Sequence, residues 1–96
     1  MILHILTKAP DSSAATQMQQ AIGEHDAVLL IEEAVTAALD TSWAAWQQCQ
    51  SRIFLLSEDL TSRGLAGIAA NNKLPTLEMQ GFVALTEQYE KTVTWY

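Results

Sequence analysis

Three short apolar runs constrain the fold of this chain more than any other feature. Residues 27–31 and 53–56 are wholly apolar, and residues 2–6 carry His4 among four apolar side chains. A strand with one solvated face alternates apolar and polar side chains, whereas a strand covered on both faces does not. The runs therefore predict buried strands of a parallel sheet.

Stretches with helical periodicity lie between and after these runs. Asp11 or Ser12 can cap a first helix that Gly23 ends. Its apolar side would carry residues at helical spacing: Ala14, Met18, Ala21 and Ile22. Further helical stretches are predicted at residues 34–39, at 43–50 after a cap at 40–42, at 57–64 as a capped turn ended by Gly64, and at 82–91. Residues 71–73 are a predicted loop, residues 75–79 a short strand and residues 93–95 a final strand.

The alternation of strands and helices predicts parallel pairing with right-handed crossovers. The expected fold class is α/β, a three-layer α/β/α sandwich with a mainly parallel sheet of about five strands. A length of 96 residues suits a single domain spanning residues 1–96. An apolar fraction of 49% excludes a disordered tail.

The charge balance argues against several classes of partner. Five Lys and Arg residues against eleven Asp and Glu residues give a net charge of −6, and the cations are scattered singly. Direct nucleic-acid binding is therefore not expected. No apolar run approaches the roughly 20 residues of a membrane span, and the first residues lack the basic start of a secretory signal. The single cysteine, Cys49, suits a reducing compartment, so a cytoplasmic location is predicted.

Ligands of open parallel sheets gather beyond the carboxyl ends of the strands. Residues 7–13 follow the first run and could cradle a phosphate, but they contain no glycine, and helix capping is the favoured interpretation. The chain has neither a dinucleotide fingerprint nor a P-loop, so no cofactor is predicted. Four acidic residues follow the second and third runs: Glu32, Glu33, Glu58 and Asp59. They could hold Mg²⁺, but carboxylates at helix N-termini need no metal, and we predict no metal site.

The residues capable of nucleophilic chemistry are few. Cys49 falls at the C-terminal end of the predicted helix 43–50, where the helix dipole disfavours a thiolate, so we predict a small packing residue. His4 lies within an apolar run and is predicted to be a satisfied core histidine, whereas His25 lies in a polar turn. Neither histidine has triad or metal-ligand spacing to a partner. No catalytic residue is predicted.

The aromatic side chains are many for so small a core. Such residues either fill the core or are buried in an interface with another chain, where Trp and Tyr are enriched. Both interpretations remain open for five of them: Trp43, Trp46, Phe82, Trp95 and Tyr96.

Several segments, taken in order, resemble the DsrH/TusB family of sulfur-relay subunits. They are residues 3–10, residues 26–32 with 35–39, residues 58–65, residues 81–86 and Trp95. The resemblance implies a DsrE-like α/β/α fold and assembly with TusC/DsrF-like and TusD/DsrE-like subunits as a dimer of heterotrimers. It leaves open whether the isolated chain associates with itself. Two departures stand out: the first helix, residues 14–20, lacks the cysteine of sulfur-oxidiser DsrH proteins, and Glu33-Ala34 replaces the family's acidic-glycine pair.

The missing cysteine favours a Tus-like role, in which the TusD-like partner carries the sulfur. The resemblance then implies a non-catalytic subunit of a TusBCD-like complex that passes persulfide sulfur toward 2-thiolation of the tRNA wobble uridine. One alternative is a DsrH-type subunit of a DsrEFH complex in sulfur oxidation. The other is a stand-alone small α/β protein that binds a ligand at residues 7–13.

Overall fold

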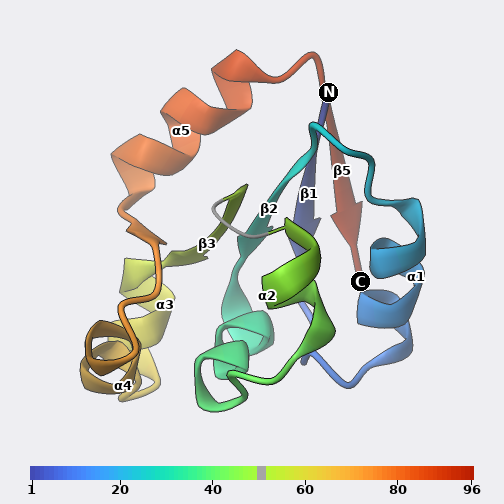
Figure 1. The fold of residues 1–96 in the computed structure, drawn as a ribbon. Helices are drawn as coiled ribbons and strands as arrows, with labels where there is room; N and C mark the ends of the chain where they lie inside the picture. Colours follow the sequence, from blue (N-terminus) through green and yellow to red (C-terminus); the bar gives the residue numbers. More distant parts are fainter. Residues whose placement is uncertain (50–51) are drawn as a thin grey trace.

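The three apolar runs form the centre of a single parallel sheet. The computed structural model describes residues 1–49 and 52–96. Its strands are β1 (Ile2–Leu6), β2 (Ala27–Leu30), β3 (Ile53–Leu56), β4 (Thr76–Leu77) and β5 (Lys91–Trp95). They pair in the order β4-β3-β2-β1-β5, and every pairing is parallel (Figure 1). The apolar runs therefore occupy the three inner positions, where both faces are covered.

Helices cover both faces of the sheet. They are α1 (Ser13–Ala21), the 3₁₀-helix η1 (Glu32–Leu39), α2 (Ala44–Cys49), α3 (Ser57–Ser62), α4 (Ala66–Asn71) and α5 (Met79–Gln88). On one face, Leu6, Val28 and Ile53 join a large core with side chains from α1, η1, α2, α3 and α4. On the other face, Leu3 and Leu29 pack against α5 alone. The predicted three-layer α/β/α fold is confirmed.

Tertiary contacts shift two predicted boundaries. Helix α5 begins at Met79 instead of residue 82 because the Glu58 carboxylate accepts the N–H of Met79, with 3.2 Å between Oε2 and N. Strand β5 begins at Lys91 instead of residue 93 because it pairs with β1 from Ile2 onward. Both partners are distant in sequence, so local periodicity did not reveal them.

Other predictions on local structure also need correction. The turn at residues 57–64 has no side-chain cap, because Leu56 occupies the N-cap position and Ser57 is already helical. Helix α4 has no counterpart among the predicted elements, since it contains Gly67 and lacks a side-chain cap. Helix α2 begins at Ala44, one residue later than predicted, and Gln50 of the predicted helix lies outside the described residues.

Gly64 ends α3 as predicted, in a conformation that requires glycine. Its φ is +71°, in the left-handed region. The N–H of Gly64 donates to the carbonyl of Thr61, and the N–H of Leu65 donates to the carbonyl of Leu60 at 2.8 Å. These two bonds form a Schellman motif. Leu60 and Leu65 are both buried in the larger core, so the motif anchors the end of the helix.

No helix in the described part of the chain combines the length and apolarity that crossing a bilayer requires.

Two glycine substitutions test the Gly64 turn. We expect Gly64→Ala to lower the free energy of unfolding by about 1–2 kcal/mol, because an L-residue is strained at positive φ. No described atom outside its chain neighbours lies within 4 Å of a Cβ built at Gly64, so the cost would come from the backbone. Gly67→Ala is the matched control, because its Cβ would also meet open space but inside a helix. It should be neutral or stabilising by up to about 1 kcal/mol in urea unfolding. Equal effects of the two substitutions would contradict this assignment.

Candidate functional site

A hydrogen-bonded chain of three side chains joins β5, β1 and the turn before β2. The indole Nε1 of Trp95 donates to Nδ1 of His4 at 3.1 Å, and His4 Nε2 lies 2.9 Å from Asp26 Oδ2. An indole N–H can only donate, so Nδ1 accepts and the hydrogen of the neutral ring resides on Nε2. His4 is 2% exposed. The prediction of a satisfied core histidine is confirmed.

Asp26, at one end of this chain, also accepts hydrogen bonds from the backbone. Its Oδ1 accepts the N–H of Ile2 and its Oδ2 accepts the N–H of Gly23, each at 2.8 Å. Arg52 donates to the backbone carbonyl of Asp26. Burial by itself raises the pKa of the Asp26 carboxyl, but hydrogen bonds from His4, Gly23 and Ile2 outweigh it and lower the pKa below its ordinary value. The carboxylate thus connects the start of β1 to the turn that precedes β2.

Two of the acidic residues beyond β2 and β3 accept hydrogen bonds from backbone N–H groups. Asp59 Oδ2 accepts the N–H of Glu32 at 2.7 Å, and Glu58 accepts the N–H of Met79. Glu32 has a φ of +53°, so the turn after β2 closes through a left-handed residue whose N–H is bonded to Asp59. Hydrogen bonds from backbone N–H groups, its own and that of Met79, lower the pKa of Glu58. In residues 1–49 and 52–96, no three His, Cys, Asp or Glu side chains gather in a way that could hold a metal ion.

A hollow of about 430 Å³ lies between α3 and the start of α5. Its lining is hydroxylic and acidic: Ser57, Glu58, Thr61, Ser62 and Glu78. The hollow does not involve the loop at residues 7–13.

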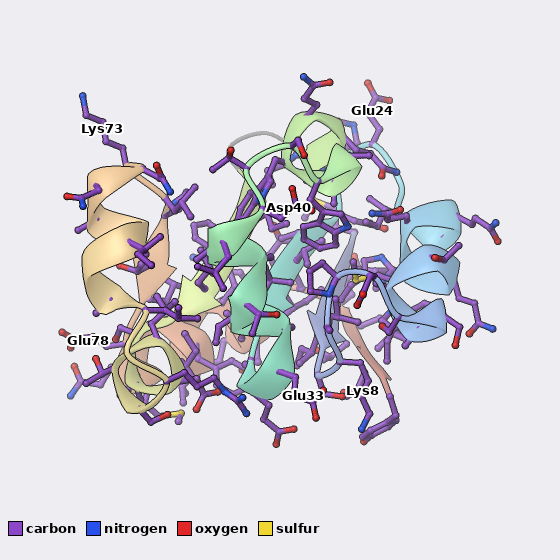
Figure 2. All side chains as sticks on the ribbon, turned by 90° about the horizontal axis from the view of Figure 1, so that it is seen from below. Lys8, Glu24, Glu33, Asp40, Lys73 and Glu78 are labelled. Carbon is purple, nitrogen blue, oxygen red and sulfur yellow. The ribbon has the colours of Figure 1, made fainter. Side chains whose placement is uncertain are left out.

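In that loop, the hydroxyl oxygen of Ser12 accepts the N–H of Ala15 at 3.2 Å. Of the two predicted caps, Asp11 and Ser12, the structure shows Ser12 as the N-cap of α1. Figure 2 shows that the labelled charges Glu24, Lys73 and Glu78 are spread around the outline of the molecule.

Cys49 is buried in the core at the last residue of α2. Its side chain is 0% exposed and belongs to the cluster that packs on the sheet. Burial raises the pKa of the thiol, the nearby Arg52 offsets part of that rise, and the charge of Asp26 adds to it. The predicted packing role is confirmed. A raised pKa and full burial both oppose reaction as a thiolate.

The five aromatic candidates lie in different surroundings. Trp43 is 8% exposed and belongs to the larger core, where its ring meets Trp46 edge-on at a centroid distance of 5.9 Å. Trp46 is half-buried and donates its indole N–H to the carbonyl of Asp40. Phe82 and Trp95 are half-buried on opposite faces of the sheet. Tyr96 is 82% exposed.

The pKa of Asp26 predicts how stability depends on pH. Because the folded state lowers this pKa, the carboxylate stabilises the fold fully above its unfolded value of 3.8, and that contribution disappears as the pH falls through the folded value. We expect Asp26→Asn to cost about 2 kcal/mol in urea unfolding at neutral pH. The difference from wild type should shrink below pH 3.8. The exposed Asp11→Asn is the control, and a pH-independent effect of Asp26→Asn would contradict the assignment.

Comparison with known proteins identifies the family. A sequence model described as "DsrH like protein" matches residues 8–92. "Protein TusB" from Escherichia coli O1:K1 / APEC is 29% identical over 96 residues, which cover 98% of this chain and 100% of that protein. "Protein TusB" from Shigella boydii serotype 18 (strain CDC 3083-94 / BS512) has the same identity and coverage. Because the family match spans most of the residues, the chain belongs to the DsrH-like family of sulfur-relay proteins.

Proposed function

We propose that this protein is a non-catalytic subunit of a TusBCD-like complex, which passes persulfide sulfur toward 2-thiolation of the tRNA wobble uridine. Family membership and the relatives named "Protein TusB" support the relay role. The observation that carries the non-catalytic part is the burial of Cys49, the single cysteine of the chain. The tRNA substrate of such a relay makes the cytoplasm the proposed location.

Sulfur relay needs an accessible thiolate. An acceptor thiolate attacks the outer sulfur of a donor persulfide, a new S–S bond forms, the old S–S bond breaks, and the donor leaves as a thiolate. The rate depends on the thiolate fraction of the attacking group and on access to it. Cys49 provides neither, because its side chain is fully buried and its thiol pKa is raised. The proposed cargo-carrying cysteine therefore belongs to another subunit.

A subunit without a reactive thiol can still bury a partner's surface and set the docking geometry. The proposed partners are TusC/DsrF-like and TusD/DsrE-like subunits in a dimer of heterotrimers. The exposed part of the aromatic set supports this proposal, above all Tyr96 at 82% exposure, with Trp46, Phe82 and Trp95 half-buried. Trp43 contributes mainly to the core of its own chain.

A DsrH-type role in sulfur oxidation would use the same fold and assembly. The absence of cysteine from α1 and the TusB names of the relatives favour the tRNA pathway. A stand-alone ligand-binding role has less support, because the hydroxyl of Ser12 in the loop at residues 7–13 is engaged in capping α1.

Replacement of Cys49 tests the non-catalytic role. In the assembled complex, Cys49→Ser should leave sulfur transfer within a few-fold of wild type, because the thiol does not react. The free energy of unfolding of the chain should fall by about 1–3 kcal/mol, since a hydroxyl replaces a buried thiol. Cys49→Ala is the matched control that introduces no polar group. Loss of transfer with the complex intact, or a persulfide found on Cys49 by mass spectrometry, would refute the proposal.

Assembly is tested by co-expression with the two paralogous subunits. The three chains should elute together in size-exclusion chromatography at micromolar concentration. Tyr96→Ala should weaken the association about tenfold, the loss expected for an aromatic anchor that contributes 1–2 kcal/mol. Leu39→Ala removes another exposed apolar side chain, 61% exposed on η1, and should leave the association unchanged. Separate elution of the wild-type chains would contradict the proposal.

A further inference from the structure

Strand β5 has hydrogen-bonding groups free along its outer edge. It pairs with β1 on one side, and within the described residues no strand pairs with its other side. The N–H of Thr7 donates to the carbonyl of Trp95, so the backbone of Trp95 points toward β1. Backbone groups alternate in direction along a strand, and Thr92 and Thr94 therefore direct their N–H and C=O groups outward.

The two edges of the sheet are protected to different degrees. Natural proteins shield edge strands by making them short, irregular or highly charged. Strand β4 at the opposite edge has two residues, whereas β5 pairs with β1 in an unbroken register over five residues. Residues 92–95 are all β-branched or aromatic, and Lys91 is the one charged side chain of the strand. Strand β5 is thus a regular template for a further strand.

Side-chain contacts hold this edge strand in place. The carbonyl of Trp95 accepts both the N–H of Thr7 at 3.2 Å and its hydroxyl at 3.0 Å. The indole of Trp95 is bonded to the buried His4, which is itself bonded to Asp26. A strand that is already ordered loses little conformational entropy when another strand pairs with it.

The helix beside β5 carries no charge. Helix α1 packs near β5, since Met18 and Trp95 belong to the same cluster, and Figure 2 shows α1 at one edge of the molecule. Its nine residues, Ser13–Ala21, contain no charged side chain although the chain has a net charge of −6. Two copies that met at this edge would avoid the like-charge repulsion expected over an acidic surface.

We propose that the α1–β5 edge, residues Ser13–Ala21 and Lys91–Trp95, binds the same edge of a second copy of this chain. The two β5 strands run antiparallel about a twofold axis at Val93, as an isologous contact requires. Thr92 then lies opposite Thr94 of the second copy, and the outward backbone groups of both are satisfied. Lys91 lies opposite the indole of Trp95, a cation–π pair. This register pairs all five residues, whereas a shifted register pairs fewer. The inference does not depend on the sulfur-relay role.

Engineered disulfides in a Cys49→Ser background test both the partner and the register. Val93 would face Val93 of the second copy in a non-hydrogen-bonded pair with about 4.5 Å between Cα atoms, a separation that a disulfide can span. Val93→Cys should therefore give a covalent dimer on mild oxidation. Thr92→Cys alone should form no disulfide-linked dimer, but a mixture of Thr92→Cys and Thr94→Cys chains should form a mixed disulfide. Thr76→Cys on β4 is the control at the opposite edge and should not cross-link.

Each other outcome overturns the inference. Val93→Cys that is folded by circular dichroism but no more cross-linked than Thr76→Cys would show that the edges do not meet. Cross-linking of Thr92→Cys alone would show a different register. A Val93→Cys chain that cross-links only to a co-expressed paralogue would assign the edge to that partner instead of to a second copy. Should Val93→Cys fail to fold, the Thr92→Cys and Thr94→Cys mixture decides the matter, because both side chains lie on the opposite face from Val93.

Discussion

The need to cover both faces of a parallel sheet governs this small structure. Residues of β1, β2 and β3 point alternately toward two apolar cores. In the part of the chain that the structure describes, five short helices cover one face and α5 alone covers the other. Single coverage by α5 leaves Phe82 half-buried and Val83 52% exposed on that side. Burial of these apolar side chains against a partner subunit would stabilise the fold further. This is consistent with the proposed role inside a complex.

The hydrogen-bonded side chains of Trp95, His4 and Asp26 attach the last strand, β5, to the rest of the sheet. Residues 2–6 and 91–95 are far apart in sequence, and among the described residues β5 pairs with a strand on one side only. A buried imidazole and carboxylate would be costly if unsatisfied, but in the described residues every buried side-chain nitrogen and oxygen has a hydrogen-bond partner. The same bonds order the edge strand that we propose as a contact between copies.

Position relative to the core also supports the proposed non-catalytic role. The single thiol lies at the end of α2 in the core, where its side chain is shielded from solvent. The carboxylates beyond β2 and β3 accept hydrogen bonds from the N–H groups of Glu32 and Met79, so their role is to hold the backbone. The described residues leave three features accessible: the uncharged helix α1, the outer edge of β5 and exposed aromatic rings. Such a molecule is suited to docking and assembly.

The sequence by itself determined the α/β class, the three inner strands, a cap at Asp11 or Ser12, the glycine stop at Gly64 and the packing role of Cys49. Each follows from residues close together in the chain: an apolar run, a capping hydroxyl, or a cysteine at a helix end. Only the tertiary structure decided the start of α5, the full length of β5 and the pairing of His4 with Asp26 and Trp95. The bonds responsible join residues at least 21 positions apart, and local periodicity carries no information on which distant polar groups meet.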